Sequence, residues 1–340
     1  MIRIPFVAYS KAAFARTSVV PVSGATLRFL STSDPSSLPS FPFKRPSGTE
    51  VPREFAELRR KCPVAKVGIV ANTSWAWILT KHADICKVLD DNENFSKIRT
   101  REGFPELTKG GRLAAMSHKP TFVDMDPPEH TVQRAMVSPM FSPEHVETLV
   151  PMIQEIANNR LKDLLASPAS KADLVAVFAL PMVSEVMYRI LGIPVADMPY
   201  LSTCNAVRTN GSATAAQAST ANQELVNYLT KLVEKQADAV VSGAGKENTD
   251  MISVLVREQL LPGHIELEDL VQVVFLLLVA GNATTVSMVA LGVQTLLQYP
   301  DQLRELKKDP SLMPNAVEEL CRLHTASALA TRKFTLIMFV

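Results

Sequence analysis

The sequence predicts a mainly α-helical protein with a small β region. Hydrophobic residues make up 47% of the 340 and charged residues 20%, so a sizeable core can form. Aromatic residues are only 6%, while Leu, Val and Ala abound, which favours helices. Residues 267–298 are apolar nearly all round in their first half, and they should form a core helix roughly 48 Å long.

The β region is expected near the N-terminus. Residues 64–70 and 75–80 are apolar and β-rich, and Ala-Asn-Thr-Ser lies between them, so they should form a hairpin. Short helices should flank it at 52–61 and 81–91. Residues 92–120 carry scattered Gly, Pro and charge and indicate a long loop, which in a compact domain usually has a function.

From Pro127 onward the pattern is almost wholly helical. Proline followed by an acid at Pro127-Pro128-Glu129 indicates a helix start, and Tyr299-Pro300 ends the long helix. Breaks are expected at 192–194 and 242–245. The other predicted helices are 143–166, 172–191, 197–209, 214–241, 248–260, 301–308 and 314–324.

The first 33 residues differ from the rest in composition. They are rich in Arg, Ser and Thr and contain no acid before Asp34, as in a mitochondrial presequence. We therefore expect residues 1–33 to direct the protein to the mitochondrial matrix; a disordered basic tail is the alternative. Residues 34–52, rich in Pro and Ser, should be a linker. The domain should extend over 53–333, followed by an aberrant apolar tail at 334–340.

Composition excludes several classes of protein. A formal net charge of +1 argues against a general nucleic-acid binder. No run reads as a membrane span, because the intensely apolar stretch 273–280 is short. The four cysteines form no Cys-x-x-Cys pair and have no accompanying histidine cluster, so we expect free thiols and no metal ligand. No Gly-x-Gly-x-x-Gly is present, so no Rossmann site is expected.

Small and polar residues interrupt the centre of the long helix. Ala280, Gly281, Asn282 and Thr284 follow one another closely, although Gly costs up to about 1 kcal/mol in such a position. Small side chains would let a flat cofactor approach the backbone, with the Thr284 hydroxyl offered to the site. A tight crossing of two helices would need the same residues, and this motif alone does not decide between them.

Two other pairs have helical spacing. Glu319 and Arg322 are three apart and can form an ion pair, as many surface residues do. His130 and Arg134 are four apart, so both donors face one way and suit paired carboxylates. An exposed basic face is the alternative for the second pair.

These motifs, in this order, resemble those of cytochromes P450, and of the fungal nitric oxide reductase branch in particular. The matching segments are Asp-Met-Asp-Pro-Pro-Glu-His at 124–130, Leu-Leu-Leu-Val-Ala-Gly-Asn-Ala-Thr at 276–284 and Glu-Glu-Leu-Cys-Arg at 318–322. The resemblance covers about residues 41 to 333. It implies the cytochrome P450 fold, a haem b cofactor, and reduction of nitric oxide to nitrous oxide by direct hydride transfer from NADH or NADPH, without an obligatory reductase partner.

The resemblance also assigns residues to roles. It implies haem contacts by His130, Arg134, Ala280 and Gly281. Nucleotide contacts are implied for Lys97, Arg99, Arg208, Arg332 and Lys333. Catalytic roles are implied for Thr284, Ser327 and Asn282, and a structural pair for Glu319 and Arg322. Oxygen-splitting relatives usually carry an acid before the central threonine; Ala283 stands there in this chain, which favours nitric oxide reduction.

The family's Phe-Gly-x-Gly-x-His-x-Cys loop, which supplies the axial thiolate, is not found in these 340 residues. Because the thiolate sets the electronics of the iron, we expect a cytochrome P450 fold lacking its C-terminal haem-thiolate segment, inactive in this truncated form. Two alternatives stay open: a cytochrome P450 monooxygenase, and a non-catalytic helical fragment without haem.

Overall fold

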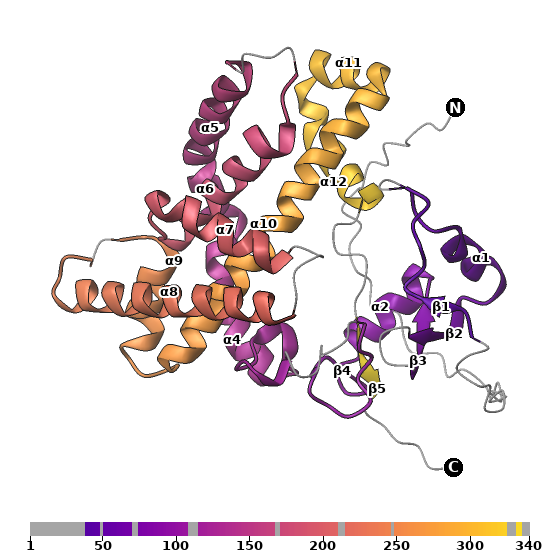
Figure 1. Ribbon diagram of the computed structural model, residues 1–340, viewed down its shortest axis with the longest axis horizontal. Coiled ribbons are helices and arrows are strands. Elements are labelled where there is room, and N and C mark those ends of the chain that lie inside the picture. Colours follow the sequence, from indigo (N-terminus) through magenta and orange to yellow (C-terminus); the bar gives the residue numbers. More distant parts are fainter. Residues whose placement is uncertain are drawn as a thin grey trace. The chain divides into compact units, whose positions relative to one another are not determined.

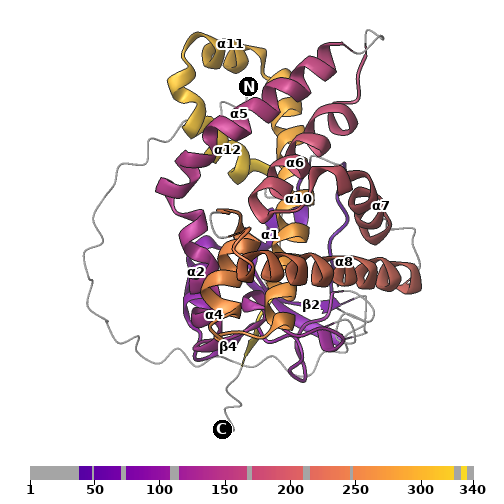
Figure 2. The same cartoon turned by 90° about the vertical axis from the view of Figure 1, so that its left-hand side faces the viewer.

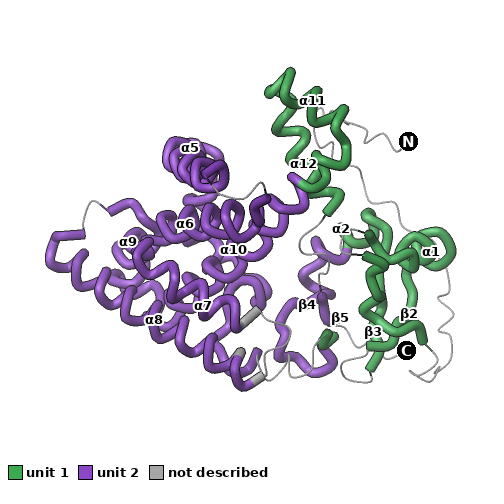
Figure 3. The backbone as a smooth tube through the Cα atoms, turned by 45° about the horizontal axis from the view of Figure 1, so that its top comes forward, with its two compact units in different colours: residues 1–87, 105–109, 294–325 green, residues 88–104, 110–293, 326–340 purple. Residues whose placement is uncertain are grey.

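The computed structural model describes residues 38–47, 50–69, 74–107, 115–166, 171–209, 215–245, 248–324 and 331–334. The predicted presequence and Ser327 lie outside the described residues. The chain forms two compact units (Figure 3). Unit 1 comprises residues 1–87, 105–109 and 294–325, and unit 2 comprises 88–104, 110–293 and 326–340.

A three-stranded sheet organises the first part of unit 1. The order is β1 (Ser40–Phe41), β2 (Val64–Ile69) and β3 (Ser74–Leu79). β2 and β3 pair antiparallel, which confirms the predicted hairpin, and β1 pairs with β2 in parallel. The inner face of the sheet is buried, and helix α1 (Arg53–Lys61) contributes apolar side chains to the same cluster.

The segment predicted to be a linker takes part in this core. Phe41 of β1 is 5% exposed, and its ring packs edge-to-face on Phe43 with centroids 5.3 Å apart. A strand of two residues is too short to show an alternating pattern, and the surrounding Pro and Ser residues dominate the composition. The sequence therefore indicated a turn-rich segment where the structure has an ordered strand.

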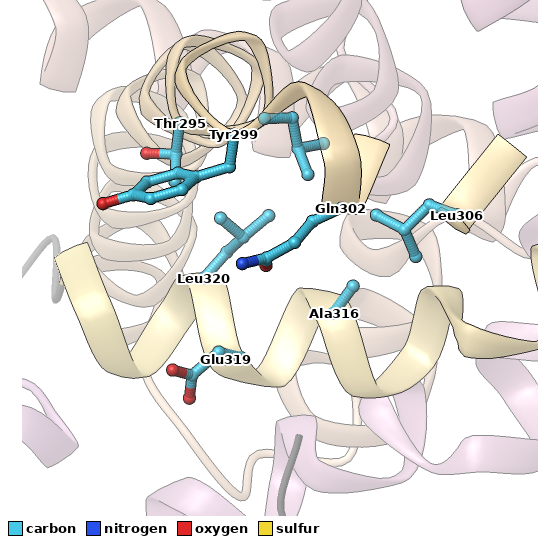
Figure 4. Close-up of a pocket in the computed structure, with 8 residues that line it drawn as sticks. Thr295, Tyr299, Gln302, Leu306, Ala316, Glu319 and Leu320 are labelled. Carbon is cyan, nitrogen blue, oxygen red and sulfur yellow. The ribbon is translucent and has the colours of Figure 1, made fainter. Parts of the chain in front are cut away.

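Helices complete unit 1. α2 (His82–Asp90), whose last three residues belong to unit 2, follows the hairpin. The end of the long helix leads into α11 (Pro300–Lys308), a short 3-10 turn (Pro310–Leu312) and α12 (Met313–His324). A small apolar pocket lies between these last helices (Figure 4). It is lined by Thr295, Leu296, Tyr299, Gln302, Leu306, Ala316, Glu319 and Leu320.

Unit 2 is a helical bundle (Figures 1 and 2). Its α-helices are α4 (Glu129–Val137), α5 (Pro143–Leu165), α6 (Leu180–Leu191), α7 (Met198–Thr209), α8 (Ala215–Val241), α9 (Met251–Leu255) and α10 (Leu267–Gln298, which ends in unit 1). The predicted helices 172–191 and 248–260 each contain one π-helical turn, at Val175–Ala179 and Val256–Leu260. Gly192 has φ 86° at the end of α6, which confirms the break predicted there.

α10 is the central element of unit 2. Its first half is buried among α4, α6, α7, α8 and α9, at Leu270, Val271, Val273, Val274 and Leu278. Among the described helices, it alone is long and apolar enough to cross a membrane, with mean hydropathy 2.0 and 28% of that stretch buried. A core helix passes the same test, so the absence of a membrane span stays a prediction.

A short ribbon joins distant parts of unit 2. β4 (Phe95–Ser96) lies within the predicted loop 92–120, and it pairs antiparallel with β5 (Lys333–Phe334). Phe334 was predicted to begin an aberrant tail, whereas the structure places it in this ribbon, opposite Phe95. Residues 335–340 lie outside the described residues. The pairing places Lys333, the last residue of the predicted domain, opposite Ser96, so Lys97 lies close to the end of that domain.

Candidate cofactor site

Positively charged side chains gather around the β4–β5 ribbon and α4. Lys97 follows β4 directly and Arg332 precedes β5, so the pairing of Ser96 with Lys333 brings them together. Burial lowers the pKa of Lys97, and the charges of Arg332 and Arg134 lower it further. We call Lys97, His130, Arg134 and Arg332 the cation cluster.

His130 is the most informative member of the cluster. Burial lowers the pKa of its imidazole, and the charges of Lys97 and Arg134 lower it further. Its Nε2 atom is buried and has no hydrogen-bond partner among the described residues. A buried polar atom without a partner needs an explanation, and a bound ligand supplies one.

Two aspartates compensate part of this charge. Asp126 accepts hydrogen bonds from the Ser96 hydroxyl and from the Lys97 backbone N–H (2.9 Å). It also lies 3.6 Å from the Arg101 guanidinium, and Arg99 lies 4.0 Å from Asp124. Within the described part of the chain, no carboxylate lies within 4.0 Å of the cationic groups of Lys97, Arg134 or Arg332. The cluster therefore has an excess of positive charge that suits an anion.

The predicted haem and nucleotide contacts were two sets, but the structure brings members of both together. His130 and Arg134 were expected at the haem, Lys97 and Arg332 at the nucleotide, and all four now belong to one cluster. Arg99 lies at its edge with Asp124. Arg208 is in α7, and no position of its side chain is described. The Lys333 ammonium lies close to Gly103, whose φ of 72° favours glycine.

One face of α10 is exposed and carries small side chains. Ala280, Ala283, Thr284 and Ser287 have helical spacing along this face. The Thr284 hydroxyl donates to the Ala280 carbonyl (2.7 Å), and the Ser287 hydroxyl donates to the Ala283 carbonyl (2.8 Å). The face thus offers a shallow surface to a flat ligand, and the Thr284 oxygen remains able to accept a hydrogen bond.

Gly281 and Asn282 lie on the side of α10 that contacts α6. A Cβ at Gly281 would lie 2.6 Å from the terminal methyl group of Met187 of α6, so the glycine leaves room for that side chain where the two helices meet. Asn282 is 5% exposed and donates to the Ser184 hydroxyl of α6 (3.0 Å). These contacts support the helix-crossing alternative for both residues, although Asn282 Oδ1 is buried without a described partner.

The predicted pair in α12 forms as expected. The Arg322 guanidinium donates to both carboxylate oxygens of Glu319, at 2.6 and 2.7 Å. That hydrogen bonding lowers the pKa of Glu319. The pair belongs to unit 1, as does the apolar pocket that Glu319 borders.

Sequence reasoning assigned no role to Asp126 or Ser96. The structure makes Asp126 the acceptor that fixes the backbone of Lys97. Its position directly before Pro127-Pro128 was part of a matched segment and could have drawn attention to it. Ser96 is fully buried, and nothing in a two-residue strand signals its partner 30 residues away.

The residues present fit the acidic edge of a haem. Its two propionates need cationic and N–H donors, which the cation cluster supplies together with the unpartnered His130 Nε2. The small side chains on the exposed face of α10 would let a flat ring approach the helix backbone. None of the four cysteines belongs to the cluster: Cys62 and Cys321 are exposed, Cys86 lies half-buried in α2, and Cys204 lies buried in α7.

Comparisons with known proteins give the family. No family model matches the chain. Cytochrome P450 55A3 of Fusarium lichenicola is 50% identical over 299 residues, which cover 88% of this chain and 71% of that protein. Vitamin D3 dihydroxylase of Streptomyces griseolus is 37% identical over 84% of this chain and 67% of its own length.

Solved structures agree in fold. The crystal structure of CYP105N1 from Streptomyces coelicolor A3(2) has a TM-score of 0.76 and 33% identity, covering 87% of this chain and 72% of that one. GfsF gives a TM-score of 0.75 with 31% identity, over 84% of this chain and 70% of its own. The predicted fold is therefore confirmed, and these homologues imply haem as the cofactor. The chain belongs to the cytochrome P450 superfamily of oxidoreductases.

Proposed function

We propose that the protein reduces nitric oxide with a nicotinamide nucleotide. The balanced reaction is 2 NO + NAD(P)H + H⁺ → N₂O + NAD(P)⁺ + H₂O. Haem, when bound, supplies the iron that holds nitric oxide. The nucleotide gives its hydride directly, so no reductase partner is required.

One observation carries this choice. The residue before Thr284 is Ala283, which is exposed on the small-residue face of α10. A carboxylate at that point could pass protons toward bound oxygen, and a methyl group cannot. Nitric oxide reduction has no O–O bond to cleave, so it does not need that carboxylate.

The cation cluster supports use of a nucleotide. Haem propionates and a pyrophosphate are both anions, and Lys97 and Arg332 can serve either. We assign His130 and Arg134 to the propionates, and Lys97 and Arg332 to the side from which the nucleotide enters. The reaction also takes up one proton, and we assign its relay to the hydroxyl of Thr284, which lies on the exposed face next to Ala283.

The test uses the protein produced from the natural transcript, loaded with haem. Nitrous oxide is measured by gas chromatography after addition of nitric oxide with NADH or NADPH and no reductase. Nucleotide-dependent nitrous oxide supports the proposal. Hydroxylation that requires an added reductase, without nitrous oxide, would replace it with the monooxygenase alternative.

A matched pair of variants tests the role of Ala283. Ala283→Asp adds a carboxylate where the anionic nucleotide approaches, and Ala283→Asn adds a neutral side chain of nearly the same size. We expect Ala283→Asp to form nitrous oxide at least about tenfold more slowly than Ala283→Asn, because like charges repel. Equal rates for the two variants would remove the charge argument.

We also propose that residues 1–33 direct the protein to the mitochondrial matrix. The test is microscopy of a fluorescent protein that carries these 33 residues. Variants with Arg3, Lys11, Arg16 and Arg28 replaced by Gln should stay in the cytosol. Mitochondrial import of the replaced form would contradict the proposal.

A further inference from the structure

The outer face of the sheet in unit 1 is apolar and exposed. β2 and β3 are in register, and alternation places one set of their side chains on this face. The set consists of Val64, Lys66 and Gly68 from β2 and Trp75, Trp77 and Leu79 from β3. We call it the tryptophan platform. It lies opposite the buried inner face, which α1 contacts, so that helix does not cover it.

Two indole rings dominate the platform. Trp75 and Trp77 are 47% and 50% exposed, and their rings meet edge-to-face with centroids 6.1 Å apart. The Lys66 ammonium lies 4.6 Å from one ring centroid and 5.3 Å from the other. These contacts order the two rings and hold a positive charge beside them. Exposed aromatic side chains gathered in this way usually mark a binding surface.

The surrounding sequence is strongly basic. Residues 38–87 contain nine Lys and Arg against four Asp and Glu, although the whole chain has a net charge of only +1. Lys61 and Lys81 are exposed just outside the end of the hairpin where Val64 pairs with Leu79. The platform therefore combines indole rings with positive charge at its centre and at one end.

We propose that the tryptophan platform binds the surface of an anionic lipid membrane. Indole rings settle at the boundary between lipid headgroups and acyl chains, where the ring is buried and the N–H stays wet. Lysines near an anionic surface add attraction. A protein partner fits less well, because protein interfaces are depleted in lysine at their centre and Lys66 lies at the centre of this face.

The chain contains only two tryptophans, and both are in the platform, so intrinsic fluorescence reports on this face directly. The probe is a vesicle of phosphatidylcholine with about one-third phosphatidylglycerol, compared with pure phosphatidylcholine. We expect a blue shift, and quenching by lipids brominated on their acyl chains, with the anionic vesicles only. Added salt should weaken both effects.

Flotation with vesicles, carried out on variants of the protein, shows which residues bind the membrane. The double variant Trp75→Ser, Trp77→Ser should bind at least about tenfold more weakly, because it loses two large apolar groups. Lys66→Gln should bind about fivefold more weakly. Leu165→Ser, at an exposed apolar residue of α5, is the control and should bind like the unchanged protein. The basic N-terminus is the same in all of them.

Circular dichroism checks that each variant is folded; Trp75, Trp77 and Leu165 are exposed and Lys66 is half-buried. No blue shift with anionic vesicles would overturn the proposal. So would undiminished flotation of the double variant, or a shift produced by a protein fraction but by no vesicle. The proposal does not depend on haem or on nitric oxide reduction, so failure of one leaves the other standing.

Discussion

Two clusters of charged residues in unit 2 differ in how far their charges are compensated. Buried Glu185 of α6 accepts hydrogen bonds from Arg160 (2.6 Å) and Arg189 (2.9 Å), so opposite charges satisfy one another within the protein. The cation cluster collects positive side chains, and only part of their charge is compensated by aspartate. The first group holds helices together. The second keeps uncompensated positive charge among the described residues, and we propose that it receives an anionic ligand.

The largest effect on stability should come from breaking the satisfied group. Glu185→Gln leaves two guanidinium groups without their carboxylate, and Arg160 Nε already lacks a partner among the described residues. We expect the free energy of unfolding to fall by about 2–3 kcal/mol. Urea unfolding measures it, with Glu234→Gln at an exposed site as the control. A loss as small as that of the control would contradict a structural role.

The same kind of change in the cation cluster should not destabilise the haem-free protein. Arg134 is exposed and repels Lys97 and His130. We expect Arg134→Gln to change the free energy of unfolding by less than about 0.5 kcal/mol, or to raise it slightly. A loss comparable to that of Glu185→Gln would show that the two groups are alike, and the comparison would fail.

His130 should make stability depend on pH. Its pKa is lowered in the folded protein, so below the unfolded value near 6.5 the unfolded chain binds more protons. Stability due to this residue is therefore present above that value and is lost as pH falls below it. As the pH falls through this range, the free energy of unfolding should decrease less for His130→Gln than for the unchanged protein, and unfolding curves at several pH values measure this.

The same titration tests the repulsion directly. In Arg134→Gln, the pKa of His130 should rise toward its ordinary value, because one neighbouring charge is gone. Nuclear magnetic resonance of the imidazole protons measures this pKa. If it stays unchanged, Arg134 lies too far away to belong to the cluster.

A small effect on stability is also expected at the ion pair of α12. The side chain of Arg322 is 67% exposed and that of Glu319 15%, and ion pairs that are open to solvent on one side contribute little. Glu319→Gln should lower the free energy of unfolding by about 0.5 kcal/mol, measured in urea. A loss above that of Glu185→Gln would give the pair a larger structural role than its geometry indicates.

Periodicity predicted the fold well where segments are long. The limits predicted for α10, 267–298, agree with the structure, because a long apolar stretch between a polar start and Tyr299-Pro300 leaves little choice. β1 and β4 were missed, because two residues cannot show a period. The π turns were missed too, since one extra residue in a helix leaves no mark in composition.

The site was less accessible to sequence reasoning. Helical spacing placed His130 and Arg134 together, but only the β4–β5 pairing brings Arg332 beside Lys97, more than 200 residues earlier in the chain. Which way Gly281 and Asn282 face depends on how α6 crosses α10, and a single sequence does not contain that information.

We propose that the cation cluster binds the carboxylates of haem. The most direct measurement compares the binding of haem with that of its dimethyl ester, which lacks the propionate charges, by visible absorption. Haem should bind the unchanged protein at least about tenfold more tightly than the ester does. Arg134→Gln should lose most of that difference, and Glu234→Gln should keep it. Equal binding of haem and ester to the unchanged protein would contradict the account.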